Sequence, residues 1–186
     1  MQSPHQRFER LIEPIHDRAL AFARCLCRSQ ADGEDLFQEA VLRALAKLDG
    51  LRDDTAFRPW LYRVIISVHR DRCRRALWRK LIPLWDAAPE PADEVDTRDA
   101  TARARTALAA LPAVQREAIV LYELGGWQVD EIAMIQRTSP SAVKSRLARG
   151  RAQLRLIYTR RLGVPAPATR TPALAAGGTA RPGETP

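Results

Sequence analysis

Apolar residues recur at helical spacing along most of the chain before residue 163, and strand-like alternation is scarce. The clearest case is segment 32–50, where apolar residues form one wide stripe and the other face is polar. Asp32 suits the N-cap of this predicted helix, and Gly50 suits its end. The pattern therefore predicts an all-α fold. The stripe consists of Leu36, Phe37, Ala40, Val41, Ala44, Leu45 and Leu48.

Proline and acidic residues separate the predicted helices into two groups. Segment 81–103 contains three prolines and six acidic residues, a composition that argues against a packed element. Residues 163–186 are rich in alanine, proline, threonine and glycine, so we expect a disordered tail there. We therefore expect two small helical domains, at residues 5–80 and 104–162, joined by a flexible linker over residues 81–103.

Segment 128–155 has the layout of a helix-turn-helix motif, with a short helix, a four-residue turn and a longer basic helix. Ser139 suits the N-cap of the second helix, and Pro140 suits its first position. Many such motifs have glycine in the turn where this chain has Arg137, which must adopt or avoid a left-handed backbone. Gly150 lies on the apolar stripe of the second helix, which predicts close packing against a neighbouring helix.

The second helix of such a motif enters the major groove of DNA with its N-terminus first. This geometry would place Ser141, Lys144 and Ser145 at base edges, where lysine can donate hydrogen bonds to guanine. Arginines further along the helix would contact phosphates, which position the protein without specifying sequence. These arginines are Arg146, Arg149, Arg151 and Arg155.

The net charge of +8 is unevenly distributed along the chain. Residues 1–80 carry +5, residues 81–110 carry −3 and residues 111–162 carry +5. No acidic residue occurs between Glu131 and Glu184, so nothing near the second helix of the motif in sequence neutralises its charge. A polyanionic partner such as DNA is therefore favoured over a solvated basic face.

Two further segments allow both a functional and a structural interpretation. Segment 57–80 combines Trp60 and Tyr62 with many arginines, which suits single-stranded nucleic acid, although Trp60 also fits the core of an amphipathic helix. The core position is the favoured interpretation for Trp60. The polar face of segment 32–50 suits either a docking surface or simple solvation. That face carries Asp35, Gln38, Glu39 and Arg43.

The chain lacks the patterns that usually accompany catalysis or metal binding. No glycine-rich phosphate loop is present, the histidines are scattered, and no motif supplies a nucleophile together with its base, so we expect no enzyme, cofactor or metal. Cys25, Cys27 and Cys73 form no CxxC pair and are expected to be free thiols. The apolar stretches are far shorter than the roughly 20 residues that cross a bilayer, and no secretory pattern opens the chain. We therefore expect a cytoplasmic protein.

Three motifs occur in an order that resembles bacterial RNA polymerase sigma factors of the sigma-70 family, extracytoplasmic function (ECF) type. They are DGEDLFQEAVLRAL, FRPWLYRVIISVHRDRCRR and LPAVQREAIVLYELGGWQVDEIAMIQRTSPSAVKSRLARGRAQLR, and the resemblance covers residues 8–158. It implies a transcription initiation factor with a sigma-2-like domain and a sigma-4-like domain. Such a factor binds core RNA polymerase, directs it to promoter DNA and assists melting, often under the control of an anti-sigma factor.

The resemblance also implies which residues contact which partner. The clamp helices of the polymerase largest subunit would bind Asp35, Gln38, Glu39 and Arg43, and the polymerase flap region would be a second contact. Contacts to the −10 element would come from Trp60, Tyr62, Arg63, Ser67, Arg70, Arg72, Arg74 and Arg75. Contacts to the −35 element would come from Arg137, Ser139, Ser141, Lys144, Ser145, Arg146, Arg149, Arg151 and Arg155.

Two positions in the −10 segment depart from the usual family pattern. Ser67 stands where asparagine is usual, and Ile66 stands where a basic residue is common, so the detailed contacts to the −10 strand stay open. Two other interpretations also stay open. One is a helix-turn-helix regulator that acts without joining the polymerase, and the other is a helical interaction module that does not bind DNA.

Overall fold

The computed structural model describes residues 3–81 and 100–162, and every regular element within these ranges is helical. The predicted all-α fold is therefore confirmed. The predicted tail lies outside the described residues, as does most of the predicted linker, although helix α5 already begins at Ala100. No described helix is long and apolar enough to cross a membrane.

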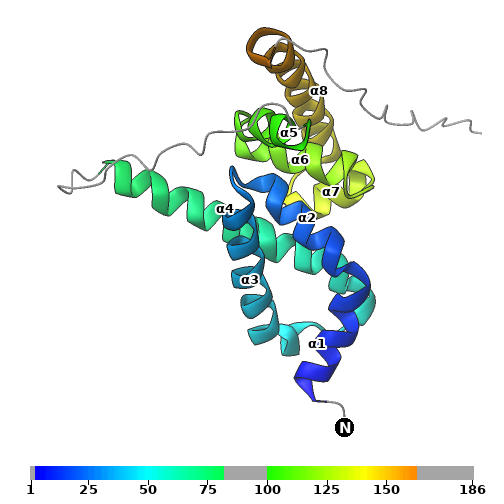
Figure 1. Ribbon diagram of the computed structural model, residues 1–186. Coiled ribbons are helices and arrows are strands. Elements are labelled where there is room, and N and C mark those ends of the chain that lie inside the picture. The colour runs from blue at the N-terminus through cyan, green and yellow to red at the C-terminus, as the bar shows by residue number, and fades with distance from the viewer. Residues whose placement is uncertain (1–2, 82–99, 163–186) are drawn as a thin grey trace, which may run out of the picture.

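The first group of helices contains four α-helices and three short 3₁₀ turns (Figure 1). The last turns of α4 extend past the other helices of the group. The predicted helix over residues 57–80 is confirmed as α4. The α-helices are α1 (Pro4–Ile12), α2 (His16–Leu26), α3 (Gln30–Ala46) and α4 (Phe57–Leu81), and the 3₁₀ turns are Glu13–Ile15, Leu48–Gly50 and Asp54–Ala56.

The start of α3 differs from the sequence prediction. Ser29, rather than Asp32, is the N-cap, because the Ser29 hydroxyl accepts a hydrogen bond from the backbone N–H of Asp32 at 3.0 Å. Gly33 therefore lies inside the helix, where it is buried. A Cβ atom at Gly33 would collide with the backbone of Arg24 in α2. The glycine in this segment thus allows α2 and α3 to approach closely, and it does not interrupt the helix.

The second group of helices forms the predicted helix-turn-helix motif with two supporting helices. Gly150 packs as predicted, since a Cβ atom there would lie 2.8 Å from Cδ1 of Ile119 in α6. The apolar side of α8 is buried at Val143, Leu147 and Gly150. The helices are α5 (Ala100–Ala109), α6 (Ala113–Glu123), α7 (Val129–Gln136) and α8 (Pro140–Ile157), which continues into a π-helical turn (Tyr158–Leu162).

The two groups of helices pack directly against each other. Helices α2 and α4 of the first group contact α6 and α7 of the second (Figure 1). Buried apolar side chains from both groups meet there and form one continuous core. This contact was not predicted from the sequence pattern.

Candidate nucleic-acid and polymerase interfaces

The turn between α7 and α8 sets the direction of the recognition helix. Arg137 adopts the left-handed conformation (φ 53°, ψ 58°) that this turn requires, and its N–H bonds to the carbonyls of Ala133 and Met134. Ser139 then caps α8 by accepting a hydrogen bond from the N–H of Ala142 at 3.2 Å, and Pro140 is the first helical residue. The predicted helix-turn-helix geometry is therefore confirmed.

One face of α8 is exposed and basic. Its members within the helix follow the helical spacing opposite the buried stripe. Small side chains near the start of the helix leave its first turn open to an approaching partner. The exposed predicted residues are Arg137, Ser139, Ser141, Lys144, Ser145, Arg149 and Arg155.

Two of the predicted DNA-contacting arginines contact neighbouring helices of the second group. Arg146 donates to the side-chain oxygen of Gln136 at 2.8 Å. Arg151 pairs with Glu123 at 2.7 Å and its side chain is only 12% exposed. Both arginines thus hold α8 against neighbouring helices, and the charge of Arg151 is balanced by an acid distant in sequence.

The aromatic residues of α4 are largely buried. Tyr62 is 1% exposed and packs against Trp127 of the second group, with ring centroids 5.1 Å apart. Trp60 is half-buried and packs against Phe57, with ring centroids 5.8 Å apart, which agrees with the core interpretation. The exposed aromatic side chain of α4 is Trp78 (61% exposed), which sequence analysis did not single out.

The other predicted −10 residues of α4, apart from Arg72, fall into two sets. Ser67, Arg74 and Arg75 are exposed. Arg63 and Arg70 reach across to the second group: Arg63 donates to the Met134 carbonyl at 3.4 Å, and Arg70 pairs with Glu117. The predicted −10 residues are therefore not all available on one open surface in this conformation.

Helix α3 presents an exposed face that includes part of the predicted docking surface. Asp35 and Gln38 are exposed, and Leu42 lies on the same face with 67% of its surface exposed. Leu42 was not among the residues predicted for this surface. The available signal was its position outside the apolar stripe of a helix whose other large apolar residues all lie in that stripe.

Glu39 and Arg43 form an ionic network between α3 and α4. Glu39 accepts from Arg43 at 2.5 Å and from Arg72 at 2.7 Å, and Arg43 also donates to Asp71 at 3.0 Å. Partial burial acts to raise the pKa of Glu39, but the hydrogen bond and charge of Arg72 outweigh it and lower the pKa. This network therefore joins α3 to α4 and fixes the orientation of the exposed α3 face. It consists of Arg72, Glu39 and Arg43.

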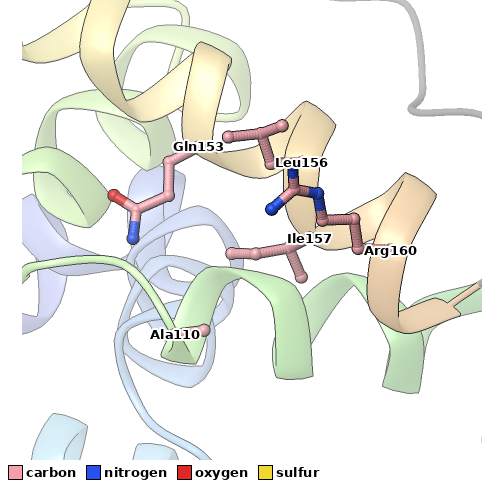
Figure 2. A pocket seen from close by; sticks show the side chains of 5 residues that line it. All are labelled: Ala110, Gln153, Leu156, Ile157 and Arg160. Carbon is pink, nitrogen blue, oxygen red and sulfur yellow. The ribbon is translucent and has the colours of Figure 1, made fainter.

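Other candidate sites are weak within the described residues. A shallow hollow of about 170 Å³ lies between the end of α5 and the end of α8 (Figure 2), smaller than the roughly 300–1,000 Å³ of typical ligand pockets. No group of three or more potential metal ligands occurs in the described ranges. Burial raises the pKa of the Cys27 thiol to about 12, so this thiol is protonated and unreactive near neutral pH. The residues lining the hollow are Ala110, Gln153, Leu156, Ile157 and Arg160.

Comparison with known proteins assigns each group of helices to a family region. Residues 11–79 match the model described as Sigma-70 region 2, and residues 101–154 match Sigma-70, region 4. Over 147 residues the chain is 33% identical to the ECF RNA polymerase sigma factor SigM of Mycobacterium tuberculosis. The aligned segment covers 79% of this chain and 74% of that relative. It is 34% identical over 163 residues to the RNA polymerase sigma factor NccH of Alcaligenes xylosoxydans xylosoxydans, covering 82% and 87%.

Two solved structures have a similar fold. The sigma factor RpoE in complex with the anti-sigma factor NepR from Bartonella quintana has a TM-score of 0.63 and 26% identity, covering 83% of this chain and 98% of that chain. CnrH in complex with the cytosolic domain of CnrY has a TM-score of 0.60 and 28% identity, covering 82% and 87%. With both sigma regions present in order, the chain belongs to the sigma-70 family of RNA polymerase sigma factors, in its extracytoplasmic function group.

Proposed function

We infer that this protein is a transcription initiation factor that binds core RNA polymerase, directs it to promoters and assists DNA melting. The observation that carries this conclusion is the presence of both sigma regions on one chain. A helix-turn-helix regulator that acts without the polymerase would need only the second region. The first region, with an exposed α3 face and a basic α4, therefore favours the initiation factor.

The α3 face is the proposed contact with the clamp helices of the polymerase largest subunit. Asp35 and Gln38 would form polar contacts around Leu42, whose exposed side chain supplies an apolar centre. Glu39 and Arg43 would position this face through their network with α4. The polymerase flap region is proposed as the contact of the second domain.

The α4 helix is the proposed contact with the −10 element. Ser67, Arg74 and Arg75 are exposed and would contact DNA directly, and Trp78 adds an exposed ring on which an unpaired base can stack. Melting then requires no nucleotide hydrolysis, because each captured base stabilises the open strand by about 1–3 kcal/mol. The half-buried or buried members of the predicted set would join after a rearrangement of the domains. They are Trp60, Tyr62, Arg63, Arg70 and Arg72.

The exposed face of α8 is the proposed contact with the −35 element. Ser141, Lys144 and Ser145 would face base edges, and Arg149 and Arg155 would contact phosphates. Arg137 and Ser139 would approach the DNA backbone from the turn. Arg146 and Arg151 would act mainly by holding α8 in place.

An anti-sigma factor is the proposed regulator. The RpoE and CnrH structures are each a complex of a sigma factor with another protein, which is named an anti-sigma factor in the RpoE complex. We therefore propose that this protein is also held inactive by such a partner and works in the cytoplasm, where the polymerase meets the chromosome.

The test is reconstituted transcription from genomic promoter fragments with core polymerase, with and without the purified protein. We expect promoter-specific runoff transcripts only when both are present, and we expect Lys144→Glu to abolish them. Core enzyme plus protein that initiates no more than core enzyme alone, on every fragment, would show that this function is wrong. Promoter activity changes that need no binding to core enzyme would instead support the regulator.

A further inference from the structure

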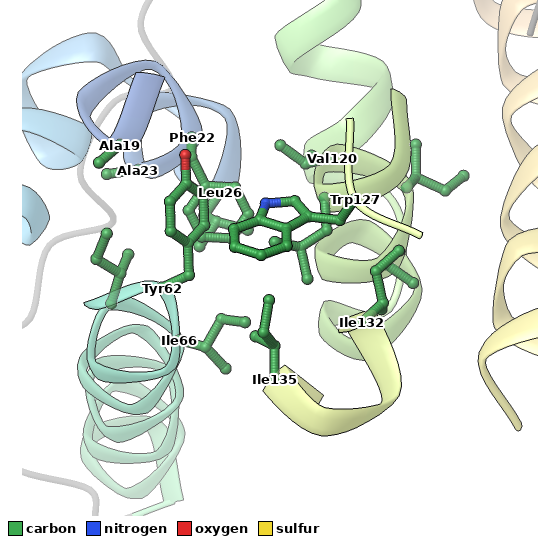
Figure 3. Close-up of a cluster of buried hydrophobic side chains, with 14 of the residues drawn as sticks. Ala19, Phe22, Ala23, Leu26, Tyr62, Ile66, Val120, Trp127, Ile132 and Ile135 are labelled. Atoms are coloured by element: carbon green, nitrogen blue, oxygen red, sulfur yellow. The ribbon is translucent and has the colours of Figure 1, made fainter. Parts of the chain in front are cut away.

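Gln136 is a buried glutamine at the end of α7, directly before the turn that leads into the recognition helix. Its side chain and backbone together are only 4% exposed. Ile132 and Ile135 of the same helix lie in a buried apolar cluster (Figure 3), so the backbone that carries Gln136 is fixed in place. A buried amide is costly unless its polar atoms are paired. The partners of Gln136 therefore indicate its role.

All the polar atoms of the Gln136 side chain have partners. Its Nε2 donates to the Val114 carbonyl and to a carboxylate oxygen of Glu117, each at 3.0 Å. Its Oε1 accepts a hydrogen bond from Nη1 of Arg146 in α8 at 2.8 Å. A rotated amide would point its oxygen at two acceptors and its donors at a cation, so the network allows one orientation. Gln136 thus always presents an oxygen to Arg146.

The acceptor that Gln136 offers to Arg146 is neutral, and the acid behind it is already balanced. Glu117 is fully buried and also accepts hydrogen bonds from Arg70 of α4, at 3.0 and 2.5 Å. Arg151 shows the other arrangement on the same helix, since a carboxylate pairs with it directly at 2.7 Å and neutralises its charge. The contact with Gln136 instead fixes Arg146 and leaves its positive charge uncompensated.

Arg146 keeps donors for a second partner. The contact with Gln136 uses Nη1, whereas Nε and Nη2 have no partner within the described residues and remain accessible to solvent. Arginine carries its N–H groups in a rigid planar fork, so fixing one nitrogen restricts the direction of the others. The preceding residues, Lys144 and Ser145, are exposed on the face of α8 that is proposed to meet the −35 element. A phosphate beside that face would therefore meet a charged and oriented fork.

We propose that Gln136 is a positioning residue for promoter binding, and that its amide orients the charged guanidinium of Arg146 toward a DNA phosphate at the edge of the −35 element. The proposal rests on the proposed role of α8 in −35 binding. It gives Arg146 a contact with DNA in addition to its part in holding α8. A long side chain that is ordered before binding loses less conformational freedom on association, so the contact becomes stronger without any additional hydrogen bond.

The variant Gln136→Met tests the positioning without DNA, because methionine keeps the length of the side chain and removes the amide. The readout is the NMR order parameter of the Arg146 Nε–Hε group in the full chain. We expect it to fall toward the value of the exposed Arg155. The control Gln153→Met makes the same change at a half-exposed position of α8 and should leave it unchanged. A Gln136→Met variant that keeps its helical circular dichroism and the wild-type order parameter would overturn the positioning.

Binding of the full chain to a fluorescent random-sequence DNA duplex tests the phosphate contact, because such contacts do not depend on sequence. We expect Arg146→Ala to weaken binding and to reduce the slope of log affinity against log salt by about 1. Gln136→Met should weaken binding by about three- to tenfold and keep the slope, since the charge remains but the side chain must be ordered on binding. In the Arg146→Ala background Gln136→Met should cause no further loss. An equal loss in both backgrounds would show that Gln136 does not act through Arg146.

Arg146→Lys is a second variant, at a position that is not buried. Lysine keeps the charge but lacks the planar fork, so we expect duplex binding to weaken by about three- to tenfold with an unchanged salt slope. Wild-type affinity in both Arg146→Ala and Arg146→Lys would overturn the proposal even if Gln136→Met does not fold. Absence of promoter-specific transcription by the wild type with core enzyme would instead refute the proposed function. The order parameter needs neither DNA nor polymerase, so it distinguishes the two failures.

Discussion

Substitution of Gly33 by alanine tests the close approach of α2 and α3. A Cβ atom at this position would lie 2.9 Å from the backbone nitrogen of Arg24 and closer still to its Cα atom, whereas optimal contacts between carbon atoms lie at about 3.5–4.0 Å. The obstacle is backbone, so α2 itself must move by roughly 1 Å. Alanine gains about 1 kcal/mol in helix propensity, but overpacking costs about 1–3 kcal/mol, with the upper end expected for a rigid obstacle.

We therefore expect Gly33→Ala to destabilise the first domain by about 1–2 kcal/mol and to lower its melting temperature by several degrees. Thermal and urea unfolding, followed by circular dichroism, measure the change. Gly50→Ala is the matched control, because a Cβ atom there meets nothing within 4 Å and the variant should be neutral or slightly stabilised. Stabilisation of Gly33→Ala by about 1 kcal/mol, as at an open helical site, would refute the reasoning.

Three further predictions follow from local geometry. Arg137→Gly should raise the melting temperature by a few degrees, because relief of about 1–2 kcal/mol of left-handed strain exceeds the entropic cost of glycine of about 0.5–1 kcal/mol; an unchanged or lower value would argue against that strain. Leu42→Ala should weaken core polymerase binding by about 1–2 kcal/mol in a competition assay and leave stability nearly unchanged, whereas Leu77→Ala, at another exposed leucine, should leave binding intact. Burial lowers the pKa of His69 below 6.5 although the charge of Glu117 acts to raise it, so the unfolded chain binds a proton first as the pH falls. Stability should therefore decrease from about pH 7.5 to 5.5, and His69→Gln should flatten this dependence in thermal unfolding measured at both pH values; an equal slope in the two proteins would contradict the assignment.

Features that depend on the residues of a single helix could be predicted from the sequence. Apolar spacing predicted α3, α4 and α8, and the Ser139-Pro140 pair predicted where α8 begins. The predicted cap of α3 was wrong because Asp32 and Ser29 both suit an N-cap, and the spacing alone does not distinguish them. Only the proximity of Arg24 reveals that Gly33 serves packing, and such proximity is a property of the folded chain.

Contacts between residues far apart in the sequence could not be predicted from helical spacing. The acid that balances Arg151 is Glu123, which lies in another helix, so the absence of nearby acids in sequence overstated the free charge of α8. Five exposed residues of the predicted −35 set share one face of α8, because helical spacing brings Ser141, Lys144, Ser145, Arg149 and Arg155 together. For the predicted polymerase-binding set, helical spacing indicated a common face but not the ionic network that turns Glu39 toward α4.

The amphipathic pattern of α4 contained a signal for the interdomain contact. Its main apolar stripe includes Leu61 and Ile65, yet Tyr62 and Ile66 lie beside that stripe and are equally buried. A helix that is apolar on more than one side must be covered on more than one side. Within this structure the second domain provides that cover through Trp127.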